Sequence, residues 1–317
     1  MLQAKYYDIV LGLHVPMIPP PTLAARMRRR AILCVLGASA CFTIAAAMVK
    51  FVAGAVPTSE IVFFRSAVAA VCMVPLIWRA GGWSVLQTRR PLGHAWRLVA
   101  GLAGMYGAFY GYAHLPLATV TALGFAMPIF LAILSVPMLH ERIGPDRALT
   151  VGAGLVGVLL VLRPWQDSDS LPAFPALVVI AGVVFWALAM ISIRRMGQYG
   201  ERNITIVLLF TLGGTVVSGL LSVPVWITPS GWVLAALTGV GAVSAVAQLL
   251  MTEGYRSGEA TMLAPFEYGA ILYTMALGFL IWGEAPGVWE FAGISILVAS
   301  GLFAWWREGR PASPAVR

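Results

Sequence analysis

The chain has 317 residues, of which 60% are hydrophobic and only 11% are charged. Soluble domains are roughly 45–50% apolar and about 25% charged, so this composition excludes a soluble protein and predicts one embedded in a membrane. The net charge of +8 does not indicate nucleic acid as a partner, because the arginines are spread over short segments between apolar runs rather than gathered on one face or in one tail.

The first 26 residues differ from the rest of the chain. They contain a PPP break and no apolar run of spanning length, and Met27 is followed directly by three arginines and the first long apolar run. We expect residues 1–26 to be a disordered tail, or translation to begin at Met27. The first run leads straight into further runs, which favours an uncleaved first helix over a signal peptide.

Ten apolar runs follow, each close to the length of a membrane-spanning helix. The links between them are short and rich in glycine and proline, which leaves no room for a soluble domain. We therefore predict an all-α polytopic membrane protein. The predicted spans are 31–53, 58–78, 96–113, 117–139, 147–163, 173–193, 204–226, 231–252, 260–282 and 287–306.

The basic residues predict the orientation of these spans. If the N-terminus lies in the cytoplasm, all but three of the 21 lysines and arginines fall on the cytoplasmic side. The exceptions are Lys50, Arg65 and Arg163. Because short cytoplasmic loops carry an excess of positive charge, we expect both termini in the cytoplasm and the protein in the cell inner membrane.

The sequence contains an internal repeat. Residues 111–141 and 254–284 both begin with Gly-Tyr, continue to an Ala-Thr pair, and end in a glutamate after an apolar span. The chain thus divides into two halves of five spans, and because five is odd the second half is inverted. Inverted repeats with a site between them are typical of secondary transporters. The predicted units are residues 27–164 and 173–306, with residues 307–317 as a cytoplasmic tail.

Several motifs in this repeat resemble a known family. The second span contains FFRSAVAAV, and the blocks LPLATVTALGFAMPIFLAIL and APFEYGAIL occupy equivalent places in the two halves. Over about residues 31–306 the chain resembles the EamA branch of the drug/metabolite transporter superfamily. The resemblance implies a ten-helix carrier of small metabolites such as amino acids, S-adenosylmethionine, riboflavin, amines or nucleotide sugars. The APFEY block is most similar to members described as metabolite or S-adenosylmethionine carriers.

Glu267 is the most unusual residue of the ninth span, about 10 Å from its cytoplasmic end. A charge at the bilayer centre costs on the order of 2.5–3.5 kcal/mol, so its carboxylate should face the protein interior or water. With Ala270, Thr274 and Gly278 it forms a small, polar helical stripe. Gly124 stands at the aligned position of the first repeat. Glu267 could bind a cationic group, carry a proton, or be a neutral structural hydrogen-bond partner.

Arg65 is the second unusual charge, about 10 Å into the second span from its outer end. It could contact a substrate carboxylate, pair with Glu60 or a backbone carbonyl, or extend toward the outer surface. Lys50, close to the outer end of the first span, is expected to extend to the surface.

Aromatic residues and prolines give further candidates. Tyr106 and Tyr110 share one face of the third span above a row of glycines that lets another helix approach, and they either line a cavity or serve packing. Pro128 and Pro265 lie in opposed spans and can kink them around a cavity. The remaining candidates for substrate binding or proton coupling are Trp186, Gln248, Tyr268 and Tyr273.

Glu141 and Glu284 are expected to be structural. Each follows a span and precedes a turn containing proline. A carboxylate there can accept hydrogen bonds from the free N–H groups of the following helix, so we expect each to cap the next span.

The predicted function is transport of a zwitterionic or cationic metabolite, such as an amino acid derivative or S-adenosylmethionine, by alternating access. Phosphate-bearing solutes need deep Lys or Arg, and the second half has none by this span assignment. The alternative is a neutral or aromatic solute such as riboflavin or a drug. A more distant alternative is an intramembrane lipid-modifying enzyme, which needs clustered His, Asp or Cys that the sequence does not show.

These expectations also predict the cofactors and binding partners of the protein. We predict that the protein is not an enzyme and has no cofactor and no metal. Its partners are a small-molecule substrate, the lipid bilayer and, if transport is proton-coupled, protons. We expect a monomer or a weak dimer, and no nucleic acid.

Overall fold

The computed structural model describes residues 21–139, 145–162, 172–257, 263 and 266–308. These residues are almost entirely helical and contain no strand. The 3₁₀ turns are η2 (Gly82–Leu86) and η3 (Val223–Val225). The helices are α1 (Pro21–Val52), α2 (Thr58–Arg79), α3 (Pro91–His114), α4 (Leu117–Gly124), α5 (Met127–Leu139), α6 (Pro145–Leu162), α7 (Ala173–Gln198), α8 (Asn203–Ser222), α9 (Gly231–Ser257), α11 (Gly269–Trp282) and α12 (Val288–Glu308).

The surface of the bundle is that of a membrane protein. Five of the described helices are long and apolar enough to cross a bilayer, and four further apolar helical stretches are shorter. Large apolar side chains point outward: Val71 is 70% exposed, Leu280 75% and Val288 85%. Apolar surface of this kind is unfavourable in water and suited to lipid. The chain is an all-α polytopic membrane protein, as its composition predicted.

The N-terminal part of α1 extends beyond the predicted span. α1 begins at Pro21, so residues 21–26 are helical, while residues 1–20 lie outside the described residues. The predictions of a tail over 1–26 and of a start at Met27 therefore stay predictions. The same holds for the C-terminal tail, of which residues 309–317 are not described.

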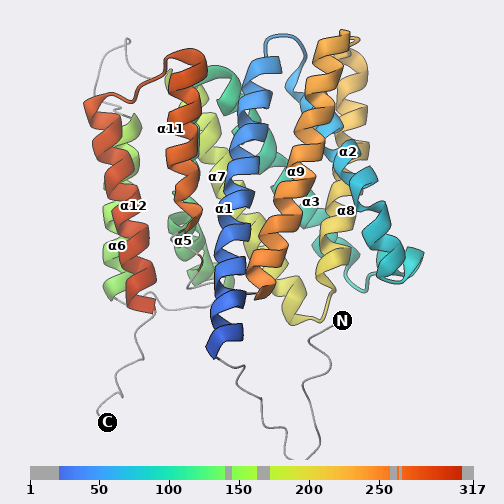
Figure 1. Cartoon of the computed structure of the whole chain (residues 1–317), viewed down its shortest axis with the longest axis horizontal. Helices are drawn as coiled ribbons and strands as arrows, with labels where there is room; N and C mark the ends of the chain where they lie inside the picture. The colour runs from blue at the N-terminus through green and yellow to red at the C-terminus, as the bar shows by residue number, and fades with distance from the viewer. Residues whose placement is uncertain (1–20, 140–144, 163–171, 258–262, 264–265, 309–317) are drawn as a thin grey trace, which may run out of the picture.

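The helices pack in pairs that respect the repeat (Figure 1). The most extensive contacts join α1 to α9 and α3 to α7, which are spans 1 with 8 and spans 3 with 6. Exchanging the two repeats converts one of these pairs into the other. The pairs α2–α8, α4–α11 and α6–α12 each join a helix to its own counterpart. The most extensive of these pairs are therefore retained on exchange, as expected for two inverted five-helix repeats related by a pseudo-two-fold axis.

Glycines allow the closest of these contacts. A Cβ atom on Gly107 of α3 would lie 2.8 Å from the Cα of Gly182 on α7. A Cβ on Gly293 of α12 would lie 2.7 Å from the carbonyl oxygen of Gly157 on α6. Larger residues would push these backbones apart, so the predicted glycine row of the third span does serve close helix approach.

Candidate functional site

The fourth span is broken in its middle. It consists of α4 and α5, separated by Phe125 and Ala126. The N–H groups of these two residues bond back to carbonyls three positions earlier, at 3.1 and 3.0 Å, which tightens the end of α4. Pro128 follows in the first turn of α5. Because proline has no N–H, it cannot donate the hydrogen bond that would continue the helix from α4 into α5. The other predicted kink residue, Pro265, lies outside the described residues.

The ninth span has a corresponding irregularity at Tyr268, which forms a turn directly before α11. When the repeats are aligned so that Glu284 falls on Glu141, Tyr268 falls on Phe125. The two rings stack, with centroids 4.7 Å apart and planes at 25°. A residue that contacts its own counterpart lies beside the symmetry axis, so the two broken spans meet at the pseudo-two-fold axis.

Gly301 of α12 makes the position of Tyr268 possible. A Cβ atom on Gly301 would lie 1.4 Å from the Tyr268 hydroxyl oxygen. Phe125 and Tyr268 also pack against one buried apolar cluster, which includes Leu123 and Ile271 from both repeats. The aromatic pair is therefore held by packing on several sides.

Two other predicted site residues lie near this pair. Glu267 directly precedes Tyr268, is partly buried and acts electrostatically on it. Trp186 of α7 lies beside α4, with its ring Cζ3 atom 3.9 Å from where a Cβ on Gly124 would be. Gly124 is the repeat counterpart of Glu267. Glu267 and Tyr268 thus lie beside the axis, and Trp186, which is 43% exposed, lies beside Gly124.

The other predicted aromatic residues lie elsewhere. Tyr106 and Tyr110 line a groove of about 330 Å³ between α3 and α7. The Tyr110 ring also stacks on His114, with centroids 4.1 Å apart, and meets the edge of Phe174. Tyr273 is partly buried on α11. Gln248 is exposed on α9 and has an interaction partner.

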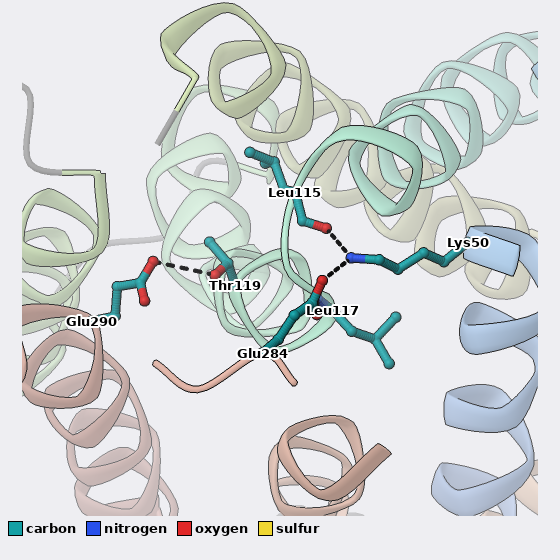
Figure 2. A network of polar contacts seen from close by, with 6 residues as sticks. All are labelled: Lys50, Leu115, Leu117, Thr119, Glu284 and Glu290. Carbon is teal, nitrogen blue, oxygen red and sulfur yellow. Dashed lines mark hydrogen bonds and ion pairs between the residues drawn. The ribbon is translucent and has the colours of Figure 1, made fainter. Parts of the chain in front are cut away.

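For the sites discussed next, the upper end of the bundle is the end where α1 ends and α2 begins, and the lower end is where α1 begins, as drawn in Figure 1. At the upper end, Lys50 connects three elements (Figure 2). Its Nζ atom donates to the Leu115 carbonyl at 2.9 Å and forms an ion pair with Glu284. It also lies 5.2 Å from the centre of the Trp282 ring. The expectation that Lys50 extends to the surface is wrong: its side chain is 13% exposed because a carboxylate and a carbonyl bind it inside the bundle.

Glu284 caps a helix, but not the one expected. Its Oε2 atom accepts a hydrogen bond of 3.0 Å from the N–H of Leu117, the first residue of α4 in the opposite repeat. The N-terminal end of α12 is capped instead by Glu290, which accepts a hydrogen bond of 2.9 Å from the N–H of Gly287. Glu290 also lies 3.5 Å from the Thr119 hydroxyl (Figure 2). Glu141, the counterpart of Glu284, lies outside the described residues.

The lower end has a related contact. Arg195, near the end of α7, donates a hydrogen bond to the carbonyl of Met138 near the end of α5. α7 is the counterpart of α1, and α5 belongs to the counterpart of the ninth span. At each end of the bundle, a basic residue thus joins two elements: Lys50 of α1 at the upper end and Arg195 of its counterpart α7 at the lower end.

A buried carboxylate joins two loops at the lower end. Glu201 Oε1 accepts hydrogen bonds from the Thr88 hydroxyl at 2.9 Å and the Arg89 N–H at 3.0 Å, and Oε2 lies 3.6 Å from His94 Nε2. Burial acts to raise the pKa of Glu201, but these hydrogen bonds and His94 outweigh it and lower the pKa overall.

Glu60 and Arg65 do not pair among the described residues. Glu60 is fully buried and accepts a hydrogen bond of 2.6 Å from the Ile227 N–H. The charge of Arg65 acts instead on Arg97 of α3. Because α3 begins at Pro91, Arg97 lies in its second turn, near the lower end. Its guanidinium stacks 4.1 Å from the centre of the Phe210 ring on α8.

Several curated proteins are similar to this chain. A riboflavin transporter from Rhizobium johnstonii is 28% identical over 81% of this chain and 83% of its own length. An S-adenosylmethionine uptake transporter from Rickettsia felis is 27% identical over 84% and 89%. A pseudopaline exporter from Pseudomonas aeruginosa is 29% identical over 83% and 91%.

Comparisons of fold and family agree. One crystal structure superposes with a TM-score of 0.61 at 18% identity and covers 92% of this chain and all of its own, which shows a shared fold. The EamA-like transporter family matches this sequence twice, over residues 29–163 and over residues 173–306. With both repeats matched, this chain belongs to the EamA-like transporter family.

Proposed function

We propose that this protein moves a small metabolite across the cytoplasmic membrane by alternating access, with the solute bound at the pseudo-two-fold axis. The observation that carries the proposal is the stack of Phe125 on Tyr268, because it brings the breaks of both repeats together beside Glu267. Transporters of inverted-repeat architecture bind solutes at such discontinuous helices between the repeats. From the basic residues, the lower end faces the cytoplasm.

The side chains at the axis favour a solute with a positively charged group. Glu267 would bind an amino or sulfonium group, or exchange a proton for the solute. Trp186 and Tyr268 offer aromatic faces, which attract cations and stack on planar rings. A zwitterionic or cationic metabolite that carries a ring system uses all three residues.

A neutral aromatic solute is the second candidate. The aromatic residues at the axis support it, as does the similarity to proteins named riboflavin transporters. Such a solute would not need the charge of Glu267. An enzymatic role has less support, since the matching family and the similar curated proteins are transporters.

The test is uptake by purified protein in liposomes, with S-adenosylmethionine and riboflavin as labelled solutes. We expect S-adenosylmethionine uptake by the wild type to fall at least about tenfold in Glu267→Gln, the loss that about 1.4 kcal/mol of binding produces. Glu253→Gln, which removes a partly exposed carboxylate paired with Arg30, is the control and should leave uptake unchanged.

The two roles of Glu267 separate in the same preparation. If Glu267 binds the solute, Glu267→Gln loses both net uptake and solute–solute exchange. If it carries a proton, only the uptake driven by a pH gradient is lost. Uptake of riboflavin alone, unaffected by Glu267→Gln, would establish the neutral aromatic alternative.

A further inference from the structure

Two arginines lie on neighbouring helices of the bundle, where α2, α3 and α8 pack together. Arg65 comes from α2 and Arg97 from α3, and both side chains are partly buried. The positive charge of Arg65 acts unfavourably on that of Arg97. Phe210 of α8 covers one face of the Arg97 guanidinium, with 4.1 Å from its central carbon to the ring centre.

The surroundings hold Arg97 in this place. A Cβ on Gly101, one turn further along α3, would lie 1.9 Å from Arg97 Nη1, so the absent side chain leaves the space that the guanidinium fills. A glycine at this position and an aromatic ring on the facing helix orient the group toward the interior instead of the lower surface. The arrangement is a fixed position for a positive charge.

The charge of this pair is not balanced by the described residues. The Nε and Nη1 atoms of Arg97 are buried, and neither has a hydrogen-bond partner among the described residues. Glu60 accepts from Ile227 through Oε1, while its buried Oε2 has no partner among the described residues, and Glu201 accepts from Thr88 and Arg89. An arginine stays protonated in proteins, so two like charges remain in a poorly solvated place.

We propose that Arg65 and Arg97 form a binding site for the carboxylate group of the transported solute. Guanidinium groups recognise carboxylates by charge-assisted, often bidentate hydrogen bonds, and an anion between the two groups would satisfy the free N–H donors and remove the repulsion. Together with Glu267, the pair would select a solute with both a carboxylate and a cationic group. As a statement about the solute, this inference rests on the proposed function.

The site is testable without transport. The melting temperature of the purified full-length protein in detergent would be measured in sodium acetate, in sodium phosphate and in sodium chloride of equal ionic strength, with acetamide as the uncharged analogue of acetate. We expect acetate to raise the melting temperature above that in chloride by about 2–4 °C. Acetamide should have no effect.

Three variants assign the effect to the pair. Arg65→Gln and Arg97→Gln should each lose the response to acetate. Arg79→Gln, which removes an exposed arginine from the same helix as Arg65, should keep it. Because one repelling charge is removed and no stacking contact is lost, Arg65→Gln should not melt below the wild type in chloride. A purely structural role for the arginines predicts the opposite, a lower melting temperature in chloride.

Three results would overturn the proposal: an equal acetate response in the wild type and both site variants, a larger response to phosphate than to acetate, or strong destabilisation of both variants in chloride. If Arg97→Gln cannot be purified, Arg97→Lys keeps the charge without the planar fork and should retain only part of the response. Glu267→Gln should keep the acetate response in full, so failure of the proposed transport and failure of this site give different results.

Discussion

Phe125 and Tyr268 occupy equivalent positions in the two repeats and stack on each other, with ring centroids 4.7 Å apart. Each ring stands at the point where its span is interrupted. The contact therefore connects the least regular parts of both repeats, and it does so next to Glu267. Changes at this pair should alter both the packing of the bundle and the shape of the candidate site.

Replacement of Gly301 by alanine should displace Tyr268. The added Cβ would lie 1.4 Å from the Tyr268 hydroxyl oxygen and 2.4 Å from its ring carbon Cζ, so the whole ring must move. Overpacking of this kind costs about 1–3 kcal/mol. We expect Gly301→Ala to lower the melting temperature and to reduce transport.

The control for this change is Gly152→Ala in α6. A Cβ at Gly152 meets no atom within 4 Å, so the substitution should be neutral or slightly stabilising. Equal melting temperatures for Gly301→Ala and Gly152→Ala would contradict the position of Tyr268.

The ion pair of Lys50 with Glu284 should be strongly coupled. The two side chains are only 13% and 22% exposed, so removing one partner leaves the other poorly solvated. We expect Lys50→Met to cost about 1–3 kcal/mol and the double variant Lys50→Met/Glu284→Gln to cost less than the sum of the single changes. The measurement is a double-mutant cycle of unfolding free energies in detergent.

An exposed pair provides the comparison for that cycle. Arg30 and Glu253 are 2.9 Å apart, but their side chains are 69% and 36% exposed. Surface pairs of this kind contribute at most about 1 kcal/mol. A coupling for Lys50–Glu284 no larger than that for Arg30–Glu253 would show that the upper-end network contributes little.

The crossing of α3 and α7 should not tolerate a side chain at Gly107. A Cβ there would lie 2.8 Å from the Cα of Gly182 and 3.0 Å from the Val178 carbonyl oxygen, and backbone atoms cannot move aside as side chains do. We expect Gly107→Ala to destabilise by about 1–3 kcal/mol. Gly197→Ala, at a glycine of α7 with nothing within 4 Å, should not. The measurement is the melting temperature of both variants, and equal values would contradict the close contact at Gly107.

Acid should remove the contribution of Glu201. Its pKa is lowered in the folded protein below the ordinary value of 4.5. A lowered folded-state pKa contributes stability that is present above the unfolded value and is lost as the pH falls through the folded value. The difference in melting temperature between the wild type and Glu201→Gln should therefore be constant near neutral pH and shrink below about pH 4.5. A difference that grows on acidification would contradict the sign.

The sequence predicted the architecture because its signals are local. Apolar run length identified the spans, and a repeat with an odd number of spans required inversion. Glu267 was recognisable for the same reason, since one carboxylate in an apolar run stands out by itself. The break before Pro128 lies where a proline in a span indicates a kink, while Pro265 stays a prediction.

Contacts between distant residues could not be read in the same way. The ion pair of Lys50 and Glu284 depends on how the first span meets the end of the ninth. The stack of Arg97 on Phe210 likewise depends on how α3 meets α8. The repeat alignment contained the equivalence of Phe125 and Tyr268, but only the crossing of the two spans shows that they touch.

The neighbour pairs of the bundle also constrain the energetics of the transport cycle. If, in the proposed cycle, each repeat adopted the conformation of the other, the main helix pairs would be retained. The two states then differ in free energy only through residues that the repeats do not share, such as Lys50 with Glu284 at one end and Arg195 with Met138 at the other. A complete reversal from 1:99 to 99:1 needs about 5.5 kcal/mol. If the two states of the proposed cycle are nearly equal in free energy, a much smaller difference in solute affinity between them is enough to shift their populations.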